Sequence, residues 1–575
     1  MAKHVVVIGA VALGPKAASR LKRLAPDTEI TMIDQANFIS FGGCGIPYFV
    51  SGEVNSVDAL RSTNYGAIRD PRYFIDRGIN MLNETRVTAI DRAAHTVSTE
   101  HVRTGEKKTF SYDKLVLGTG SIPKMPPVEG RDLGNVTSAT KLEAAQLVRD
   151  ACASGKVASA VVVGGGFIGL EMAVALADMW GVKTSVVEFM DQLMPGVLSP
   201  VLADMVRHDL ESNGVSVYTS EKVMRLEGKD GMVTRAVTDK RTLDADLVIF
   251  ATGFAPNSAL AQAAGLDIDP VTKGILVNDH MQTSDPDIYA GGDCVAVPNL
   301  ISGKPACFQL GSIANRQGRV IGTNLAGGDA TFKGAVGTWA VKLFKISACG
   351  VGLTPARAES AGFAPLAVNV EQLDRAHFYP EKEMMTLELV VDKNTRQMLG
   401  LQGVCTAGDA LKARIDAAAT MLQFGPRTLD DLSNAEAAYA PPFSGALDTL
   451  NVVANVADNV LAGRLVPLSS REFSNLWKER DVNHVYFVDS RPAAASEKTA
   501  AAYPGQWHAL PLEALFADDA AEKLAALPKD RPMALICNTG LRSYEVMLKL
   551  RRAGFDNLSM ALGGMQTMIK RGETF

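Results

Sequence analysis

Two stretches of the chain change from a run of apolar residues to a glycine-rich turn and then to the spacing of an amphipathic helix. The first reads HVVVIG from residue 4, and the strand EITMID follows its helix. The second reads SAVVVGGG from residue 159, and TSVVE follows its helix. Strand, turn, helix and strand in this order predict a parallel, Rossmann-like sheet that binds a dinucleotide.

The first turn matches the Gly-x-Gly-x-x-Gly spacing in part, because Gly9 and Gly14 occupy its ends and Val11 stands in the middle. Asp34 lies twenty residues after Gly14. A carboxylate at this spacing can accept the ribose hydroxyl groups while the helix N-terminus holds the pyrophosphate. We therefore predict a dinucleotide site. The alternative is a glycine turn in an α/β domain without a ligand.

The second turn has the complete spacing, with Gly164, Gly166 and Gly169. Glu188 follows the last glycine by nineteen residues. An acidic residue suits a free 2′-hydroxyl and repels a 2′-phosphate, so we favour NADH over NADPH, although the nearby Lys183 weakens this preference. Two dinucleotide sites in one chain suggest a flavin that exchanges electrons with a nicotinamide, and FAD and NADH are the expected cofactors.

Three further segments accompany these turns. YDKLVLGTGSIP (112–123) and DADLVIFATGFAPN (244–257) each read as a strand followed by Thr-Gly, and TSDPDIYAGGDC (283–294) places Asp293 after two glycines. Together they resemble the two-dinucleotide-binding flavoprotein disulfide reductase superfamily, over roughly residues 1–455. The resemblance implies that the first turn holds FAD, that the second holds NADH, and that Asp293 hydrogen-bonds the ribityl chain of the flavin.

This resemblance also predicts the domain organisation. The FAD-binding domain is expected at 1–122 and 251–332, interrupted by an NADH-binding domain at 123–250. An α+β dimerisation domain is expected to follow at 333–464.

The segment FISFGGCGIPYFVSG (38–52) contains one cysteine, Cys44. Most disulfide reductases of the superfamily carry a cysteine pair in this segment. Since a lone thiol cannot form an internal disulfide, its redox partner must be flavin, oxygen chemistry or an external thiol. The small residues around Cys44 allow a flavin ring and a thiol substrate to approach closely. The alternative is a buried structural cysteine.

The pattern Ser-Phe-x-x-Cys-Gly-x-Pro-Tyr, from Ser40 to Tyr48, resembles the coenzyme A disulfide reductases and the related NADH-dependent persulfide reductases and NADH oxidases. The resemblance implies that Cys44 alternates between a thiolate and a mixed disulfide with CoA. It also implies a homodimer in which Tyr379 and Tyr439 complete the site of the other subunit. Their phenolic hydroxyls can protonate a leaving thiolate. Otherwise they are packed interface tyrosines.

CoA carries a 3′-phosphate and a pyrophosphate, so it requires cationic partners. The helix after the first turn is rich in cations. The residues predicted from the family pattern to bind CoA are Lys16, Arg20, Arg23, Ser40 and Arg77. A solvated helix face is the alternative explanation for the cations.

A new α/β pattern begins after about residue 465. VYFVDSRP (485–492) and MALICN (533–538) read as buried strands, and a helix follows the loop from Cys537 to Arg542. The thiol of Cys537 therefore lies at a helix N-terminus, where N–H groups stabilise an anionic persulfide, and Arg542 adds a positive charge. The module resembles a rhodanese domain over 468–575, with Asp489 and Arg491 in its Asp-x-Arg motif. The alternative is an inactive docking domain.

Composition excludes several classes of protein. The 58 Lys and Arg residues against 63 Asp and Glu give a net charge of −5, whereas a nucleic-acid partner requires a strongly basic face. The longest uncharged run, 247–266, contains Gly253 and Pro256, so we expect no membrane span. Seven scattered cysteines do not form a disulfide framework and favour the cytoplasm. No metal-ligand spacing is present, and no metal is expected.

These observations predict an α/β fold with two Rossmann-like dinucleotide-binding domains, an α+β dimerisation domain and a C-terminal rhodanese-like α/β domain. The expected activity is NADH-dependent, FAD-mediated reduction of CoA persulfide, polysulfide or CoA disulfide through Cys44, coupled to sulfur handling at Cys537. The alternatives are a water-forming NADH oxidase, a non-catalytic redox sensor or sulfur carrier, and a plain CoA disulfide reductase whose rhodanese domain is incidental.

Overall fold

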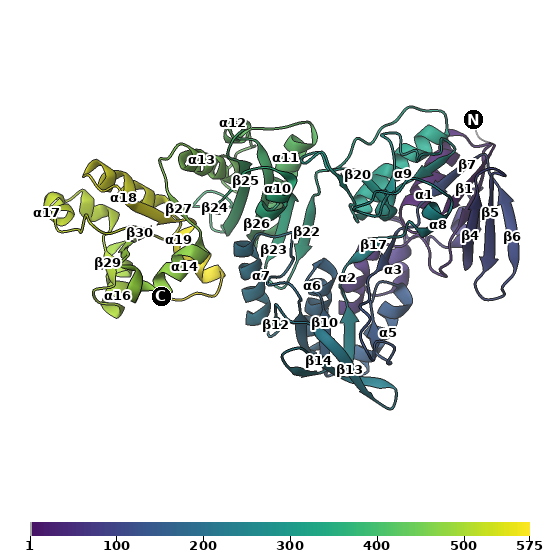
Figure 1. Cartoon of the computed structure of the whole chain (residues 1–575), viewed down its shortest axis with the longest axis horizontal. Helices are drawn as coiled ribbons and strands as arrows, with labels where there is room; N and C mark the ends of the chain where they lie inside the picture. Colours follow the sequence, from purple (N-terminus) through teal and green to yellow (C-terminus); the bar gives the residue numbers. More distant parts are fainter. Residues whose placement is uncertain (1–2) are drawn as a thin grey trace. The chain divides into compact units, whose positions relative to one another are not determined.

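The apolar run from residue 4 is the middle strand of a parallel sheet with the order β19-β7-β1-β2-β3. In the computed structural model, which describes residues 3–575, its strands are β1 (His4–Ile8), β2 (Glu29–Ile33), β3 (Asn80–Leu82), β7 (Lys114–Leu117) and β19 (Ile288–Ala290). The strands are largely buried, because the helices described below and residues of a three-stranded sheet, including Val97 and Phe110, pack in the same core. Segments before and after the second glycine turn thus share one sheet (Figure 1).

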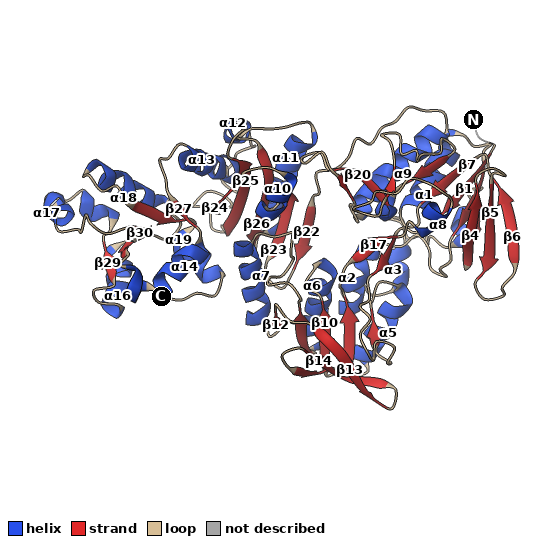
Figure 2. Ribbon diagram, viewed as in Figure 1, coloured by secondary structure: helices blue, strands red, loops and turns tan. Residues whose placement is uncertain are grey.

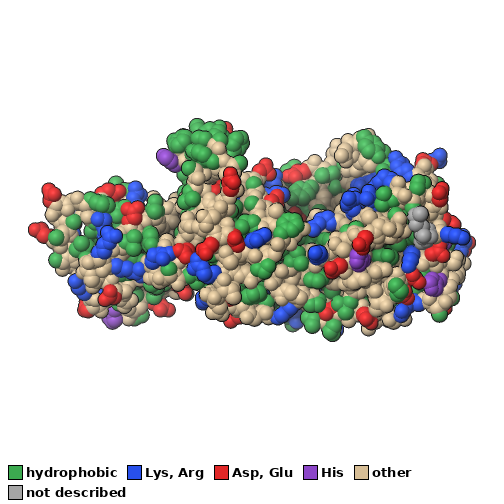
Figure 3. Space-filling view, turned by 90° about the horizontal axis from the view of Figure 1, so that it is seen from above, with side chains coloured by type: hydrophobic (Ala, Val, Ile, Leu, Met, Phe, Trp, Pro, Cys, Tyr) green, Lys and Arg blue, Asp and Glu red, His purple; other side chains and the backbone are tan. Residues whose placement is uncertain are grey.

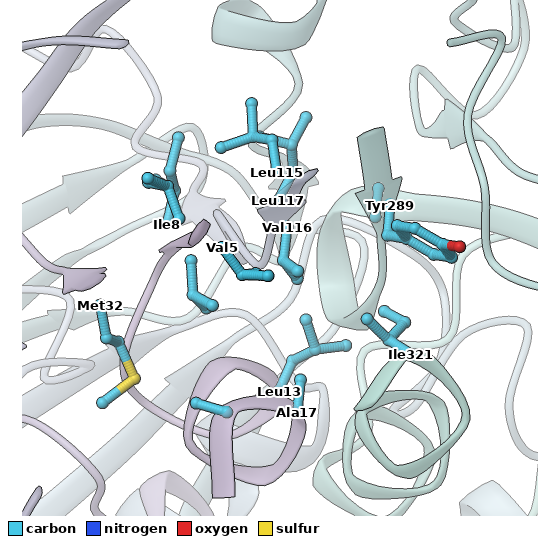
Figure 4. Packing of buried hydrophobic residues seen from close by; sticks show 14 of the residues in the cluster. Val5, Ile8, Leu13, Ala17, Met32, Leu115, Val116, Leu117, Tyr289 and Ile321 are labelled. Atoms are coloured by element: carbon cyan, nitrogen blue, oxygen red, sulfur yellow. The ribbon is translucent and has the colours of Figure 1, made fainter. Parts of the chain in front are cut away.

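Helices α1 (Leu13–Leu24) and α9 (Gly311–Leu325) cover this sheet. Figure 4 shows Leu13 and Ala17 of α1 beside Ile321 of α9, all facing the side chains of the strands. The short helices α2 (Ile46–Ser51), α3 (Val57–Arg61), α4 (Pro71–Ile75) and α8 (Ala259–Ala263) belong to the same unit. Two small sheets of this unit are formed by segments that flank the second glycine turn. One contains β4 (Thr85–Asp91), β5 (Thr96–His101) and β6 (Lys107–Ser111), and the other contains β18 (Ile275–Leu276), β20 (Val295–Pro298) and β21 (Pro305–Ala306).

The second glycine turn follows β10 of another parallel sheet, with the order β12-β11-β10-β16-β9. Its strands are β9 (Val136–Thr137), β10 (Ser159–Val163), β11 (Lys183–Val187), β12 (Ser216–Tyr218) and β16 (Leu247–Phe250). Helix α6 (Phe167–Val174) starts at the turn and continues as a π-helix over Ala175–Met179, and α5 (Leu142–Ala153) precedes β10. A three-stranded sheet follows, with β13 (Val223–Lys229), β14 (Met232–Thr238) and β15 (Thr242–Asp244).

The two Thr-Gly segments pair with each other. Strands β8 (Ser121–Pro123) and β17 (Phe254–Pro256) run antiparallel, with Ile122 opposite Ala255. The chain therefore leaves the first sheet and returns to it through one two-stranded connection.

The first compact unit comprises Met1–Met190 and Gly214–Gly337, and the second comprises Asp191–Asn213 and Thr338–Phe575. The sequence 191–213, within the expected NADH-binding range, thus forms part of the second unit. Its helix α7 (Pro200–Ser212) begins after Ser199, whose backbone N–H donates to Gln402 Oε1 at 2.9 Å.

The second unit contains an antiparallel sheet with the order β22-β23-β26-β25-β24. Its strands are β22 (Trp339–Lys342), β23 (Ser347–Gly352), β24 (Pro365–Leu373), β25 (Met384–Asp392) and β26 (Met398–Cys405). Helices α10 (Pro355–Ala361), α11 (Gly408–Gln423), α12 (Leu429–Ser433) and α13 (Thr449–Leu461) accompany this sheet. This is the α+β arrangement predicted for the dimerisation domain.

The same unit ends in a parallel sheet with the order β27-β31-β30-β28-β29 (Figure 2). Its strands are β27 (Pro467–Leu468), β28 (Tyr486–Asp489), β29 (Trp507–Ala509), β30 (Met533–Ile536) and β31 (Leu558–Ala561). Its α-helices are α14 (Ser470–Lys478), α15 (Arg480–Asn483), α16 (Ala493–Ala502), α17 (Ala520–Ala525), α18 (Leu541–Arg552) and α19 (Gly564–Lys570). The predicted α/β fold class is confirmed.

Acidic and basic side chains are both spread over the face shown in Figure 3. Within residues 3–575, no helix combines the length and apolar character that crossing a membrane requires. The same residues contain no group of three or more His, Cys, Asp and Glu side chains able to hold a metal ion.

Candidate active site

The first glycine turn is closed by backbone contacts that leave no room for side chains. Gly9 has φ +100°, and a Cβ atom there would lie 2.1 Å from Gly118 O. Asp34 lies beside this turn, where its carboxylate accepts the N–H groups of Ala10 at 2.7 Å and Ala36 at 2.8 Å. Burial raises the pKa of Asp34, and these N–H groups oppose the shift. The glycine and the acid predicted to bind the same dinucleotide are therefore adjacent.

The second turn repeats this arrangement. Glu188 accepts the N–H groups of Gly165 at 2.6 Å and Met190 at 2.8 Å. A Cβ atom on Gly164 would lie 2.4 Å from Ala251 O, but a Cβ atom on Gly166 would meet nothing within 4 Å. Gly166 precedes the first residue of α6, so the open space lies at a helix N-terminus, where a pyrophosphate is favoured. These residues fit a dinucleotide.

Asp293 lies in a short turn directly after β19. Its Oδ2 atom accepts a hydrogen bond from Ser121 Oγ at 2.9 Å. Burial raises the pKa of Asp293, and the Ser121 hydroxyl opposes this shift. The carboxylate of Asp293 also acts electrostatically on Cys44, which brings two predicted site residues from distant parts of the sequence together.

Cys44 lies in the turn Gly43–Gly45 immediately before α2, as a free and exposed thiol. Desolvation by surrounding protein atoms raises the pKa of this thiol, and the carboxylates of Glu171 and Asp293 raise it further. The backbone N–H of Gly311, the first residue of α9, acts in the opposite sense. The Cys44 thiol is therefore influenced by residues from α6, from the turn after β19 and from the start of α9.

Glu171 was not singled out by the sequence analysis. It lies on α6, two residues after Gly169, and Tyr48 donates a hydrogen bond from its hydroxyl to Glu171 Oε1 at 3.3 Å. Burial raises the pKa of Glu171 to about 7. Burial is also the main cause that raises the pKa of Tyr48 to about 12, and the charge of Glu171 adds to this shift. The only sequence signal is an acidic residue in an otherwise apolar helical turn.

The residues predicted to bind CoA have different environments. Lys16 and Arg23 are exposed on α1, and Arg20 Nε donates to Thr323 Oγ1 of α9 at 3.2 Å. Ser40 is buried with φ 49°, and its backbone N–H donates to Ala10 O at 2.7 Å. This bond joins the Cys44 segment to the first glycine turn.

Arg77 is exposed near the end of the α4 segment. Its guanidinium lies 3.6 Å from the centre of the Tyr73 ring, and Nη1 donates to Tyr73 O at 2.8 Å. Tyr73 thus holds Arg77 in one orientation. The role of these residues toward CoA stays a prediction.

Tyr379 and Tyr439 lie on two neighbouring loops of the second unit. The loops are joined by a hydrogen bond from Ala376 N to Pro441 O at 3.3 Å. The buried Arg414 donates to the carbonyl oxygens of Asp374 and Phe443, one in each loop segment. The structure therefore brings the two predicted tyrosine segments together.

Cys537 is buried at the end of β30, and the loop that follows leads into the twelve-residue helix α18. The N–H of Gly540 donates to Cys537 Sγ at 3.2 Å, and Gly540 has φ +108°. Arg542 Nε lies 3.7 Å from a Glu513 oxygen atom. The thiol thus receives a backbone N–H at the start of α18, whereas the Arg542 guanidinium lies beside Glu513, and its role toward Cys537 stays a prediction.

Asp489 and Arg491 form a structural pair in this module. The buried Asp489 carboxylate accepts from Arg491 Nη2 at 2.6 Å and from Trp507 Nε1 at 2.9 Å. Arg491 also donates to Thr499 Oγ1 at 2.7 Å. These bonds connect β28, β29 and α16.

Comparison with known proteins identifies the family of the chain. Residues 3–317 match the model of the pyridine nucleotide-disulphide oxidoreductases, and residues 338–451 match the dimerisation domain of that family. The chain belongs to this oxidoreductase family. The oxidoreductase is 35% identical over 458 residues to a protein from Pyrococcus abyssi named NAD(P)H sulfur oxidoreductase (CoA-dependent), covering 79% of this chain and 98% of that one.

Two solved structures resemble this oxidoreductase over nearly its whole length. A NAD-dependent persulfide reductase from A. fulgidus is 38% identical, with a TM-score of 0.91 and coverage of 98% and 99% of the two chains. The reduced Bacillus anthracis CoADR-RHD is 27% identical, with a TM-score of 0.88 and coverage of 99% and 98%. The predicted resemblance to CoA disulfide and persulfide reductases is confirmed.

A third structure supports the cofactor prediction. It is described as a FAD-dependent pyridine nucleotide-disulphide oxidoreductase from Desulfovibrio vulgaris, is 54% identical and covers 80% of this chain and 100% of its own, with a TM-score of 0.66. The expected cofactor classes, a flavin and a pyridine nucleotide, are those of the family.

Proposed function

We propose that this oxidoreductase uses NADH to reduce CoA persulfide, polysulfide or CoA disulfide at Cys44, and that Cys537 handles sulfane sulfur. The observation that carries the proposal is the position of Cys44. It is a lone, exposed thiol whose pKa is raised by the charges of Glu171, on the helix after the second glycine turn, and of Asp293, after β19. The names of the P. abyssi and A. fulgidus relatives support a sulfur substrate.

The two glycine turns indicate which residues would bind each cofactor. FAD would be held by Gly9, Gly14, Asp34 and Asp293. NADH would be held by Gly164, Gly166, Gly169 and Glu188. Both oxygens of Glu188 already accept backbone N–H groups, so its side chain is held in one orientation where the adenosine ribose would bind. This supports NADH over NADPH. When bound, FAD supplies transfer of an electron pair from NADH to a disulfide.

Cys44 would act as the nucleophile. Its thiolate attacks the inner sulfur of a CoA persulfide, the new bond joins Cys44 to CoA, and the outer sulfur leaves as hydrosulfide. An electron pair then breaks the Cys44–CoA bond, which releases CoA thiolate and restores the Cys44 thiolate. One persulfide, one NADH and one proton thus yield CoA, hydrogen sulfide and NAD⁺. During this exchange, CoA would be held by Lys16, Arg20, Arg23, Ser40 and Arg77.

A homodimer would bring Tyr379 and Tyr439 to the site of the other subunit. The match to the family's dimerisation domain supports this assembly. So does a set of exposed aromatic side chains on the two joined loops: Phe378 (65% exposed), Tyr439 (52%) and Phe443 (70%). Such side chains are commonly buried at interfaces. A tyrosine hydroxyl there can protonate the leaving thiolate.

The state of the cysteines bears on the compartment in which the protein works. All seven cysteines are free thiols, which supports a reducing, cytoplasmic compartment. We propose a small-molecule sulfur substrate and no nucleic-acid or membrane partner.

Anaerobic NADH oxidation tests the proposal. The wild-type holoenzyme is expected to oxidise NADH with CoA persulfide, polysulfide or CoA disulfide, Cys44→Ser to lose this activity, and the buried-thiol control Cys152→Ser to keep it. Fast oxygen consumption without a sulfur acceptor would favour an NADH oxidase instead. No anaerobic turnover with any acceptor would favour a sensor or carrier.

The part played by Cys537 requires its own variant. Loss of persulfide turnover in Cys537→Ser supports coupling between the two thiols. Full persulfide turnover in Cys537→Ser would show that the rhodanese-like domain is incidental to the reductase.

A further inference from the structure

Helix α19 contacts both the Cys537 loop and the antiparallel sheet of the second unit (Figure 1). At its first turn, Met565 N donates to Cys537 O at 2.9 Å and Gln566 N donates to Asn538 O at 3.0 Å. A Cβ atom on Gly564 would lie 2.2 Å from Cys537 O, so the loop is held at close range. One short helix therefore fixes two successive carbonyl groups of the loop that carries the thiol.

Fixing these carbonyls also fixes the amides that follow them. In a planar trans peptide the N–H points away from the carbonyl oxygen of the same unit. The N–H groups of Asn538 and Thr539 are therefore directed to the side of the loop opposite α19. Amides in this loop, together with Gly540 N, are the groups that would stabilise an anionic sulfur.

The other end of α19 is held by a buried network on β24 and β25. Lys570 Nζ has three donors and three partners: Glu371 Oε2 at 2.7 Å, Met384 O at 2.9 Å and Thr386 Oγ1 at 2.9 Å. Glu371 Oε1 accepts from the hydroxyls of Thr386 at 2.7 Å and Thr567 at 3.0 Å.

Every side-chain polar atom at the centre of this network has a hydrogen-bond partner. Glu371, Thr386 and Thr567 are all 0% exposed, and Asn369 Nδ2 donates to the Thr567 hydroxyl at 3.3 Å. The Lys570 side chain is 25% exposed, but its partner Glu371 is fully buried, so removing Lys570 leaves a buried carboxylate uncompensated. The network is therefore suited to set where α19 lies.

We infer that Glu371, Thr567 and Lys570 are positioning residues for Cys537: through α19 they orient the loop amides that stabilise its reactive sulfur. This inference deepens the proposed function and rests on Cys537 being the sulfur-handling thiol. It assigns to the antiparallel sheet a part in the chemistry of a loop more than 150 residues away in sequence.

The test is the pH profile of Cys537 alkylation in the full-length holoenzyme. Iodoacetamide is used, and the peptide containing Cys537 is followed by mass spectrometry. Lys570→Met and Thr567→Val are expected to move the pH of half-maximal rate upward by roughly half a unit, because the amides no longer favour the anion as strongly. Lys523→Met, which breaks the exposed pair with Asp519 on α17, is the matched control and leaves the profile unchanged.

Melting temperatures of all variants are measured alongside. A lower melting temperature with an unchanged alkylation profile in both variants would overturn the inference, because the network would then only stabilise the module. If Lys570→Met does not fold, the near-isosteric Thr567→Val and Glu371→Gln decide the question. Wild-type protein that fails to transfer sulfur from thiosulfate to cyanide, while the variants still shift the profile, would reject the proposed function of Cys537 and leave the positioning intact.

Discussion

Tyr48 donates a hydrogen bond to Glu171 at 3.3 Å, which joins the helix after Cys44 to the helix that follows the second glycine turn. Glu171 therefore places a negative charge near the thiol from the side of the NADH turn. Burial raises the pKa of Glu171 to about 7, so this charge develops between about pH 6 and pH 8.

Glu171→Gln is expected to lower the pKa of the Cys44 thiol. Burial makes the largest contribution to the raised pKa, but the Glu171 charge adds to it, and the Asp293 charge remains in the variant. A neutral amide removes one like charge, so more thiolate is present at a given pH above 7. Alkylation of Cys44 as a function of pH measures the shift.

The exposed Glu143 on α5 provides a control for this experiment. Glu143→Gln removes the same charge, but Glu143 is not among the groups that shift the pKa of Cys44, so the profile is expected to stay unchanged. An unchanged or upward-shifted profile in Glu171→Gln would show that its carboxylate does not govern the thiol.

Gly166→Ala is expected to weaken NADH binding without affecting folding. The added Cβ atom meets no protein atom within 4 Å, and it occupies the space through which a pyrophosphate approaches the backbone. We expect a dissociation constant at least about tenfold higher, equivalent to roughly 1.4 kcal/mol, by titration of the holoenzyme.

Gly164→Ala gives the opposite behaviour. Its Cβ atom would lie 2.4 Å from Ala251 O at a φ of +108°, so we expect a loss of folding stability. Equal NADH affinity in Gly166→Ala and the wild type would exclude this turn as the nucleotide site.

Asp489→Asn is expected to destabilise the C-terminal module by roughly 3–5 kcal/mol, because it removes the negative partner of a guanidinium that is only 12% exposed. The carboxylate accepts from Arg491 and Trp507, and Asp489 is 0% exposed. Chemical denaturation followed by fluorescence measures the change. The exposed Asp519→Asn is the control and should cost less than about 1 kcal/mol. A small effect of Asp489→Asn on stability would contradict a structural role for the Asp489–Arg491 pair and would favour a role in catalysis.

Local patterns predicted much of this molecule. The glycine turns with Asp34 and Glu188 could be recognised because strand, turn, helix and acid lie within some thirty consecutive residues. The Cys537 loop could be recognised for the same reason. Contacts between distant segments leave no local pattern in the sequence. Glu171 pairs with Tyr48 across 123 residues, and Lys570 pairs with Glu371 across 199.

The grouping of helix α7 with the second unit was also outside the reach of sequence patterns. The helix buries Leu202, Val206 and Leu210, but the sheet that it contacts begins more than 100 residues later. Which partner an amphipathic face selects depends on the packing of the whole fold, and periodicity reports only that such a face exists.

The most direct test of the central claim is the covalent state of Cys44 after reaction with CoA disulfide. We predict that anaerobic incubation without NADH adds one CoA to the peptide containing Cys44, with release of one CoA thiol, and that NADH then removes the adduct. Intact-protein and peptide mass spectrometry give both results. An unmodified Cys44 peptide, or an adduct that NADH does not remove from the FAD-loaded protein, would contradict the account.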